Sequence, residues 1–496
     1  MQTLLTTAQM RMADTFTISN KPISSVNLME RAAEAFVTAL LRENLGYDKA
    51  IAVFCGQGNN GGDGLAIARL LFNNHYKNLK VFIANFTAQQ SDDFSANLQR
   101  LKNLPVDIVA IQDVAEIKNL QTTTIIIDAL IGSGLNKPLT GKMEALVSLI
   151  NGLNKTIYAV DVPTGFFAEG VLPANYNGIK AFKTICFQRP KINFFFPESV
   201  QATEQFEVMD IGLDESYIQN LPSIFKLVEI SDIRKILKPR KNFSHKGTYG
   251  HALLVAGATQ TMGAAILNAK GCLYAGAGLT TLSIPESGLA TLNTALPEVM
   301  YAAREGLGNH AAKYNAIAIG SGLGTSVVAK TLLEEMLLLK RALVLDADAL
   351  NLLAKHQELL VLVSSGSVLT PHVKEFDQLF GKHNSWYERL ATASKQAVKL
   401  KSVIVLKNQY TFIVSRGGMV HINPTGNSGM AQGGMGDVLT GVLTAYLAQG
   451  IPAEEAAIAA CYFHGKSGDD LAVDHFNITA SQLAENIPQV VRHIIG

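Results

Sequence analysis

Short runs of apolar residues recur along the first part of the chain, and segments with helical spacing separate them. The runs cover residues 50–56, 80–84, 122–130, 156–165 and 183–187. Uninterrupted apolar runs of this length are typical of strands buried on both faces, and helices between them indicate a parallel sheet. Helical spacing is present over 26–44 and again over 65–74. The sequence therefore predicts an α/β domain whose parallel sheet is covered by helices on both faces.

A second series of apolar runs follows later in the chain. Its predicted strands cover residues 251–258, 279–285, 316–322, 342–350, 367–371 and 402–408. A hairpin is expected over 411–423, where the turn RGG separates TFIVS from MVHIN, and two closing helices over 437–450 and 452–472. Between the two series the pattern weakens over 212–242, which is typical of a domain boundary. We expect two different α/β domains, at residues 1–215 and 225–496.

The composition argues against several classes of protein. Charged residues make up 17 % of the 496 residues, the formal net charge is +1, and no apolar run is long enough to span a membrane. The basic stretch 238–247 is short and is interpreted as a solvated linker, so we expect no nucleic-acid partner and no membrane. The four cysteines form no CxxC pair, and the first residues lack a secretory pattern. These features predict a cytoplasmic protein with free thiols and no structural zinc.

The most distinctive turn of the first half is GQGNNGGDG at 56–64, between a predicted strand and a predicted helix. Backbone N–H groups in such a turn bind anions. The pattern GxGxxG also matches the fingerprint of dinucleotide-binding dehydrogenases, which expect an acidic residue at the end of the next strand. Here that strand ends in Asn85. The sequence therefore disfavours hydride transfer.

Three strand ends of this half carry side-chain oxygens. They belong to Asn59, Asn60, Asp63, Asp128, Asp161 and Thr164. Because the carboxyl ends of parallel strands face one crevice, these oxygens are expected to lie close together. Such a cluster could hold a cation or a reacting hydroxyl. The alternative is that each residue only caps a helix or stabilises a turn.

Together with LMERAAEA at 28–35, DALIGSGL at 128–135 and DVPTG at 161–165, the glycine turn resembles the NAD(P)HX epimerase domain. The resemblance covers residues 1–215 and implies a Rossmann-like three-layer α/β/α fold. Members of that family interconvert the R and S forms of hydrated NADH and NADPH, and they bind K⁺. The substrate would be lined by Asn59, Asn60, Gly61, Gly62 and Asp63. Its phosphates would be held by Gly132, Ser133, Gly134, Leu135, Asn136, Lys137 and Pro138.

The same resemblance assigns the chemistry of this half. Asp161 would contact the reacting nicotinamide ring and act as the acid or base. Potassium would be bound by Asn60, Asp128 and Thr164, and oxygen ligands of this kind suit a hard cation. Thr164 stands where the family commonly has serine. Its hydroxyl and carbonyl can serve in the same way.

The strongest signal of the second half is NSGMAQGGMGDVLTGVL at 427–443. The turn GGMG leads directly into a predicted helix, and Asp437 lies in its first turn. Backbone donors at a helix N-terminus stabilise charge on a transferring phosphoryl group, and an aspartate there can deprotonate a substrate hydroxyl. The alternative is that Asp437 only caps the helix.

This half resembles the ribokinase-like superfamily and, within it, the NAD(P)HX dehydratases, so a ribokinase-like α/β/α domain is expected. The shared pieces include KGTYGHALLVAGA at 246–258, GSGLG at 320–324, LDADALN at 345–351, LTPH at 369–372 and GGMGDVL at 433–439. The family uses ADP or ATP to phosphorylate the hydroxyl of the hydrated ring, after which phosphate leaves and NAD(P)H is restored. Mg²⁺ is expected from phosphoryl chemistry.

The resemblance assigns two groups of residues in this half. The hydrated cofactor would contact Ala264, Gly322, Gly324, His372 and Asp437, with Asp437 as the base. The nucleotide would be held by Lys407, Asn408, Gln409, Tyr410, Thr411 and Gly436. Asn408 replaces the usual glycine and Ser321 the usual proline, and neither change removes a reacting group. Asp346 and Asp348 either touch the site or cap the turn, and the second interpretation is preferred.

Three hypotheses were compared. The first is a bifunctional nicotinamide nucleotide repair enzyme, in which one half epimerises the hydrate and the other dehydrates its S form. The second is a vitamin- or sugar-type kinase with an accessory domain, which leaves the oxygens of the first half unexplained. The third is a non-catalytic nucleotide-binding scaffold. The first hypothesis is preferred, with small-molecule substrates and a homo-oligomeric assembly.

Overall fold

The structure is a computed structural model that describes residues 1–117, 120 and 122–496. The chain divides into two compact units. Residues 3–223 together with 385–387 form one unit, here called the N-terminal unit. Residues 1–2, 224–384 and 388–496 form the other, the C-terminal unit. Over the described residues, no helix combines the length and the apolar character needed to cross a membrane.

The N-terminal unit contains a seven-stranded sheet in which every neighbouring pair is parallel, in the order β4-β3-β2-β5-β6-β7-β8. The strands are β2 (Ile51–Cys55), β3 (Leu79–Ala84), β4 (Asp107–Ile111), β5 (Ile125–Ala129), β6 (Thr156–Val160), β7 (Ala181–Phe187) and β8 (Thr203–Met209). The strand order reverses its direction between β2 and β5. In open α/β sheets, ligands bind at the carboxyl ends of the strands next to such a reversal.

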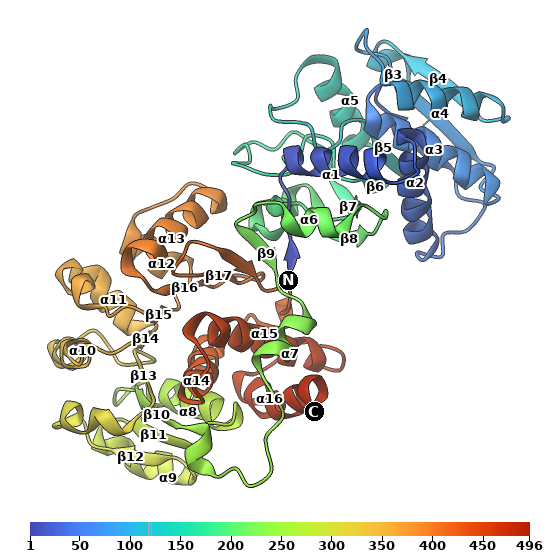
Figure 1. The fold of residues 1–496 in the computed structure, drawn as a ribbon. Helices are drawn as coiled ribbons and strands as arrows, with labels where there is room; N and C mark the ends of the chain where they lie inside the picture. The colour runs from blue at the N-terminus through green and yellow to red at the C-terminus, as the bar shows by residue number, and fades with distance from the viewer. Residues whose placement is uncertain (118–119, 121) are drawn as a thin grey trace. The chain divides into compact units, whose positions relative to one another are not determined.

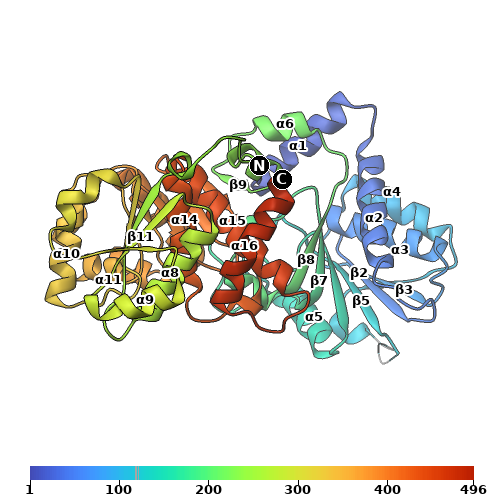
Figure 2. The same ribbon diagram turned by 90° about the horizontal axis from the view of Figure 1, so that it is seen from below.

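Helices cover both faces of this sheet (Figures 1 and 2). They are α1 (Thr7–Asn20), α2 (Ser25–Leu41), α3 (Asn59–Asn73), α4 (Asp92–Lys102), α5 (Gly141–Gly152) and α6 (Glu215–Asn220). Val53 of β2 packs in the core beneath α2, α3 and α4, whereas its neighbour Phe54 packs in the core beneath α5. This alternation is the two-residue period of a strand that is buried on both faces. The predicted Rossmann-like three-layer architecture is confirmed.

Several local predictions in this unit were wrong. The helix after the glycine turn was expected from residue 65, but α3 begins at Asn59. Helix α1 was missed because only Ala13 and Thr17 of its residues are buried, which leaves little apolar periodicity. Edge strands β4 and β8 were missed for a related reason, since both are partly exposed and lack a continuous apolar run. The strand expected over 156–165 ends at Val160.

The C-terminal unit contains an eleven-stranded sheet in the order β1-β9-β18-β17-β16-β15-β14-β13-β10-β11-β12. Strand β17 is antiparallel to β16 and β18, whereas the pairs from β16 to β12 are parallel. The strands are β1 (Gln2–Thr3), β9 (Phe225–Leu227), β10 (His251–Val255), β11 (Leu279–Ser283), β12 (Met300–Ala302), β13 (Ala316–Ile319), β14 (Val344–Leu345), β15 (Val368–Leu369), β16 (Val403–Leu406), β17 (Phe412–Val414) and β18 (Val420–Ile422). The predicted hairpin is formed by β17 and β18.

Two helical layers enclose this sheet. The helices are α7 (Ile230–Ile236), α8 (Met262–Tyr274), α9 (Leu289–Ala295), α10 (Val327–Leu338), α11 (Asp348–Lys355), α12 (Val373–Phe380), α13 (Trp386–Leu400), α14 (Met435–Ala448), α15 (Ala453–Leu471) and α16 (Ala480–Ile495). One core unites α8, α14, α15 and α16, and a second core unites α10 and α11 on the opposite face (Figure 1). Two closing helices were expected, and α16 is a third. The strand expected over 342–350 ends at Leu345, because α11 begins at Asp348.

All four cysteines of the chain are buried and none forms a disulfide. Burial raises the pKa of the Cys186 and Cys461 thiols to about 12. A thiol with so high a pKa carries almost no thiolate at neutral pH, and the thiolate is the nucleophile. These side chains are therefore parts of the apolar core.

Helices α8 and α14 are in backbone contact at two glycines. A Cβ atom at Gly441 would lie 2.0 Å from the carbonyl oxygen of Asn268, and one at Gly271 would lie 2.3 Å from the carbonyl oxygen of Val438. Neither contact has space for a side chain, since the obstacle is backbone in both cases. The beginning of α14 is therefore held in one position against α8.

We expect Gly441→Ala to lower the free energy of unfolding by about 1–3 kcal/mol or more, because the two helices must separate. Urea denaturation of the full chain measures the change. Gly263→Ala is the matched control, since α8 offers open space around that glycine. The control is expected to be neutral or slightly stabilising. Equal destabilisation in both variants would contradict the contact.

Candidate active sites

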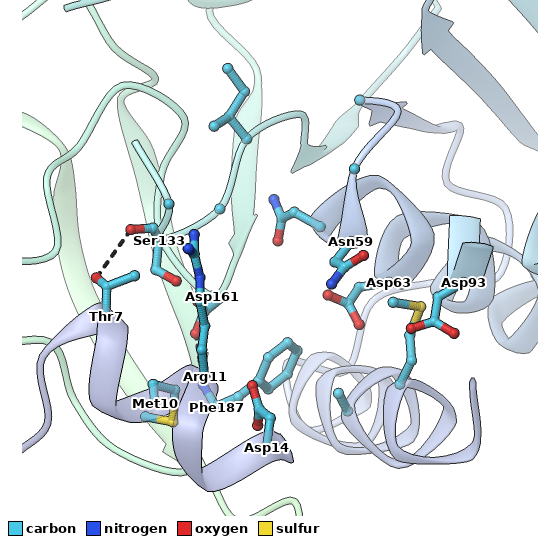
Figure 3. Close-up of a pocket in the computed structure, with 18 of the residues that line it drawn as sticks. Thr7, Met10, Arg11, Asp14, Asn59, Asp63, Asp93, Ser133, Asp161 and Phe187 are labelled. Carbon is cyan, nitrogen blue, oxygen red and sulfur yellow. Dashed lines mark hydrogen bonds between the residues drawn. The ribbon is translucent and has the colours of Figure 1, made fainter. Parts of the chain in front are cut away.

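A cavity of about 750 Å³ opens at the carboxyl ends of the strands in the N-terminal unit (Figure 3). Its walls come from α1, α2, the beginning of α3, the turn after β5 and the segments after β6 and β7. In Figure 3, Arg11 and Asp14 of α1 lie opposite Asn59 and Asp63 of α3, and Asp161 is drawn on the same side as Arg11. Thr7 closes one side, where its hydroxyl donates a hydrogen bond of 3.2 Å to the carbonyl oxygen of Ser133. The cavity is large enough for a small organic ligand.

Asp161 follows β6 directly and has a left-handed backbone, with φ of 65°. Its N–H donates to the carbonyl oxygen of Ile185 at 2.9 Å, and its Oδ1 accepts from the N–H of Phe187 at 3.2 Å. Lys191 Nζ lies 2.7 Å from the same Oδ1 and is 6 % exposed. Burial alone would lower the pKa of Lys191, but the charge of Asp161 raises it above its ordinary value. The two side chains therefore form a buried ion pair at the cavity wall.

Two further carboxyl groups in this cavity are less acidic than usual. Burial, reinforced by the charge of Asp161 and opposed by Lys191, raises the pKa of Asp14 to about 6. Burial and the charges of Asp161, Asp14 and Asp93 raise the pKa of Asp63 well above its ordinary value. The cavity therefore contains the Asp161–Lys191 ion pair and two carboxyl groups that retain a proton more readily than usual. Carboxyl groups with a raised pKa are common at functional sites.

Asp128 and Thr164 are fully buried behind the cavity wall. The N–H and the hydroxyl of Thr164 each donate to the Asp128 carboxylate at 2.7 Å. Burial raises the pKa of Asp128 to about 6, although these hydrogen bonds lower it. Asn60 lies nearby, because a Cβ atom at Gly132 would be 3.2 Å from its side chain, and the buried Nδ2 atom of Asn60 has no hydrogen-bond partner among the described residues. The three residues that the sequence predicts as potassium ligands, Asn60, Asp128 and Thr164, therefore lie near the carboxyl ends of β5 and β6.

The structure brings together part of the predicted substrate site. The predicted residues that line the cavity are Asn59, Asn60, Asp63, Gly132, Ser133, Gly134 and Asp161. Gly61 and Gly62 lie behind this surface, where added Cβ atoms would meet the carbonyl oxygen of Gly56 and the sulfur of Met29. The remaining predicted residues follow in a loop that does not line the cavity: Leu135, Asn136, Lys137 and Pro138.

Sequence reasoning missed four charged residues of this cavity: Arg11, Asp14, Asp93 and Lys191. Lys191 could have been found, since it follows the predicted strand 183–187 and the rule of strand ends applies to it as to Asp161. Asp14 and Arg11 lie on α1, a helix whose weak apolar pattern gave no reason to place it beside the sheet.

The second candidate site surrounds Asp437 in the first turn of α14. The helix follows Gly434, whose φ of 88° is a left-handed conformation that favours glycine. Burial and the charge of Asp346 raise the pKa of Asp437 to about 6, while a hydrogen bond with Ser321 and the charge of Lys407 lower it. A carboxyl group with this pKa is mostly ionised at neutral pH and can still accept a proton.

Asp346 connects three parts of this site. It is 1 % exposed, and its carboxylate accepts hydrogen bonds from the hydroxyls of Thr370 and Thr440 at 2.8 Å. Lys407 Nζ lies 2.9 Å from the same carboxylate. Of the two alternatives for Asp346, these contacts favour the one in which it touches the site, because Lys407 is a predicted nucleotide residue. Asp348 is closer to a cap of the turn, since it accepts from the N–H of Gly324 at 2.8 Å and opens α11.

The predicted nucleotide residues lie in the connection from β16 to β17. Lys407 is near Gly436, where an added Cβ atom would lie 3.5 Å from its Nζ. The charges of Asp346 and Glu375 raise the pKa of Lys407 against the effect of burial. Thr411 closes the connection by donating from its hydroxyl to the carbonyl oxygen of Asn408 at 3.1 Å. Gln409 and Tyr410 lie between these two residues.

The other predicted hydrate residues of this unit come from three segments: Ala264 lies in α8, Gly322 and Gly324 follow β13, and His372 follows β15. Ala264 and Gly322 are in contact, since a Cβ atom at Gly322 would lie 2.9 Å from that of Ala264. His372 begins α12, where its Nδ1 accepts from the N–H of Glu375 at 3.1 Å. The histidine therefore has a capping role, and its side chain is 51 % exposed. Its Nε2 lies 3.3 Å from Oε1 of Glu375, so both ring nitrogens face that residue.

Among the residues that the structure describes, no group of three or more His, Cys, Asp or Glu side chains is arranged to hold a metal ion. Mg²⁺ in phosphoryl-transfer sites is commonly bound through substrate phosphates, water and one or two carboxylates. A site such as the one around Asp128 is of another type, because its further potential ligands are carbonyl, amide and hydroxyl oxygens.

Comparison with known proteins gives the same division. A family model described as NAD(P)H-hydrate dehydratase matches residues 252–489, and one described as YjeF-related protein N-terminus matches residues 25–193. A bifunctional NAD(P)H-hydrate repair enzyme from Moorella thermoacetica is 32 % identical over 99 % of this chain and 97 % of its own length. A relative of the same name from Escherichia coli is 31 % identical over 90 % of this chain and 84 % of its own length. A solved ribokinase-like superfamily protein from Enterococcus faecalis is 30 % identical, with a TM-score of 0.51, over 56 % of this chain and 99 % of its own.

Two α/β units, each with carboxyl groups of raised pKa, and a ribokinase-like fold in the second unit define the chain as an enzyme. The near full-length similarity is more specific. The chain belongs to the family of bifunctional NAD(P)H-hydrate repair enzymes.

Proposed function

We propose that the N-terminal unit interconverts the R and S forms of hydrated NADH and NADPH, and that the C-terminal unit dehydrates the S form with ADP or ATP. The observation that carries the first half is the Asp161–Lys191 pair in the wall of the large cavity. The observation that carries the second half is Asp437 at the start of α14, beside Lys407 and Gly436.

Epimerisation requires the carbon that bears the added hydroxyl to lose its configuration. The adjacent ring nitrogen can donate its electron pair to that carbon when the hydroxyl leaves as water, and water can return to the other face. The outgoing hydroxyl needs a proton, and the incoming water must lose one. Asp161 is positioned to accept a proton, while Asp14 has a pKa of about 6 and can supply one. The cavity thus contains both partners of the exchange.

Asp128, Thr164 and Asn60 fit a bound potassium ion. The donors are a buried carboxylate, a hydroxyl and an amide, which are oxygen ligands of the kind that hard cations prefer. The buried charge of Asp128 has no cationic side chain among the described groups that donate hydrogen bonds to it. When bound, the ion would supply positive charge next to the loop of Gly132 to Gly134. Thr164 orients the carboxylate through its N–H and hydroxyl.

Thr164→Val is expected to weaken potassium binding by about 10- to 100-fold, because the valine cannot orient Asp128 through a hydroxyl. Epimerisation measured against KCl concentration, with tetramethylammonium chloride as the balancing salt, should then require more potassium. Thr184→Val is the matched control, since this buried threonine bonds to Thr203 on the neighbouring strand. An unchanged potassium dependence in Thr164→Val would exclude this residue from the ion site.

Dehydration in the C-terminal unit requires a different mechanism from epimerisation. Hydroxide leaves poorly and phosphate leaves well, so transfer of a phosphoryl group to the ring hydroxyl makes elimination possible. Asp437 accepts the hydroxyl proton, and the N-terminus of α14 stabilises charge on the transferring group. The site offers Lys407 as a cation beside Gly436. Magnesium supplies further positive charge when nucleotide binds.

The direct test uses chemically hydrated NADH with ADP or ATP and follows the absorbance of reduced nicotinamide. Full recovery of absorbance from an R and S mixture requires both activities, whereas recovery of only the S fraction shows dehydration alone. ATP-dependent phosphorylation of a vitamin or sugar hydroxyl without such recovery would instead support a kinase with an accessory domain.

A further inference from the structure

Arg11 of α1 lines the cavity of the N-terminal unit, and its side chain extends from the helix toward Ser133 (Figure 3). A Cβ atom added at Gly134 would lie 2.8 Å from Arg11 Nη2. The start of α1 is fixed on the same turn, because the Thr7 hydroxyl donates to the carbonyl oxygen of Ser133 at 3.2 Å. The guanidinium of Arg11 therefore lies against the backbone of the turn that follows β5.

This turn presents backbone donors to the cavity. The N–H of Ile131 donates to the hydroxyl of Thr164 at 3.0 Å, which fixes the beginning of the turn. The next three N–H groups, those of Gly132, Ser133 and Gly134, donate to no residue that the structure describes. All three residues line the cavity. Successive backbone N–H groups of this kind form anion-binding concavities.

The charge of Arg11 is not used by another side chain. Among the described residues that line the cavity, Arg11 and Lys191 are the cationic ones. Lys191 is paired with Asp161 at 2.7 Å. The guanidinium of Arg11 forms no ion pair or hydrogen bond with a described residue, not even with Asp14 one helical turn further along α1. A guanidinium presents several donors in a planar arrangement that matches the oxygens of a phosphate group.

Without Arg11, the cavity would repel an anion. The described part of its wall contains four carboxyl groups, those of Asp14, Asp63, Asp93 and Asp161. The ammonium group of Lys191 offsets only the charge of its partner. Asp63 and Asp93 are drawn on the opposite side of the cavity from Arg11 (Figure 3). Positive charge and free backbone donors therefore coincide at one side of the cavity, beside the turn after β5.

We propose that Arg11, together with the N–H groups of Gly132 to Gly134, binds the diphosphate of hydrated NADH or NADPH. The proposal rests on the proposed function of the N-terminal unit as the epimerase. The diphosphate is an anionic group that both substrates share, and it takes no part in the exchange at the nicotinamide ring. A contact with this group is equally strong before and during the reaction, so it lowers KM and leaves kcat nearly unchanged.

The test measures KM and kcat of R-to-S exchange by the full chain, once with hydrated NADH and once with hydrated NADPH. In Arg11→Gln, KM should rise by about 10- to 100-fold for both substrates, the effect expected when a hydrogen bond to a charged group is lost. The kcat should change by less than about threefold. Arg11→Lys keeps the charge but not the paired donors, so its KM should lie between those of the wild type and Arg11→Gln.

ADP-ribose is a second probe, since it carries the diphosphate but no nicotinamide ring. It should inhibit the exchange competitively in the wild type, and about 10- to 100-fold more weakly in Arg11→Gln. Arg31→Gln is the matched control. Arg31 of α2 is also exposed and lies against a glycine, with its Nη1 3.2 Å from a Cβ atom added at Gly212, but it does not line the cavity. Its KM and its inhibition by ADP-ribose should be those of the wild type.

An unchanged KM and unchanged inhibition by ADP-ribose in Arg11→Gln would overturn the proposal. A fall in kcat without a rise in KM would also overturn it, since the residue would then act on the reaction and not on binding. So would a rise in KM for hydrated NADPH alone, because that result would assign Arg11 to the 2′-phosphate. Absence of R-to-S exchange in the wild type would instead overturn the proposed function, so the two failures are distinguishable.

Discussion

Asp437→Asn is expected to reduce nucleotide-dependent dehydration by about 100- to 10,000-fold, the range in which general bases contribute to catalysis. The amide has nearly the shape of the carboxylate, so the start of α14 should be unchanged, but it cannot accept the hydroxyl proton. In the wild type, the pKa of Asp437 is raised to about 6, so dehydration should be constant above that pH and fall as the pH drops through it. Recovery of reduced nicotinamide from the purified S hydrate measures both effects.

Epimerisation is the internal control for this variant, since its proposed residues belong to the other unit. It should proceed at the wild-type rate. Loss of both activities with an unchanged melting temperature would contradict the assignment of one reaction to each unit. Dehydration at more than one tenth of the wild-type rate would show that Asp437 is not the base.

Asp161→Asn is expected to reduce exchange between the R and S forms by about 100- to 10,000-fold while dehydration of the S form continues. Asparagine is preferred to alanine because the left-handed backbone at this position, with φ of 65°, is tolerated better by asparagine. Chromatographic separation of the two forms, starting from pure R hydrate, measures the exchange. In the same variant, an R and S mixture with nucleotide should recover only its S fraction.

Lys191→Met tests the Asp161–Lys191 ion pair by removing its ammonium group. The substitution leaves the carboxylate of Asp161 without the cation that lies 2.7 Å away. Epimerisation should then be slower than in the wild type, because the carboxylate loses the partner that holds it in place at the cavity wall. The dehydration rate of the variant serves as the control. An epimerisation rate identical to that of the wild type would show that the ion pair has no part in the exchange.

Much of the architecture could be predicted because the buried strands are recognisable in the sequence as runs of apolar residues. Each interior strand of the N-terminal sheet overlaps a predicted apolar run, although β3 and β7 begin one and two residues earlier than predicted. Val53 and Phe54 of β2 illustrate the burial of such a strand, because they pack on opposite faces. The elements that were missed have exposed surfaces. Helix α1 and strand β4 both expose much of their surface, and partial exposure removes the periodicity on which prediction depends.

The site was predicted less completely than the fold, for a physical reason. Motifs identify residues that are close in sequence, such as Asn59 to Asp63, but a buried ion pair joins residues from different strand ends. Asp161 and Lys191 are 2.7 Å apart only because β6 and β7 are neighbours in the sheet. Asp346 shows the same limit, since its partners Thr370, Lys407 and Thr440 come from three later segments. The sequence of the turn alone could not show whether Asp346 caps the turn or binds these three residues.

The burial of every native cysteine has a practical consequence for experiments on movement. Because the chain offers no accessible thiol, a cysteine introduced on the surface of each unit can be labelled with a fluorophore without background. Val200 of the N-terminal unit and Val328 of the C-terminal unit are suitable, since they are 72 % and 70 % exposed. Single-molecule energy transfer between such dyes, recorded with hydrate and nucleotide present, would show whether the two units change their separation during turnover.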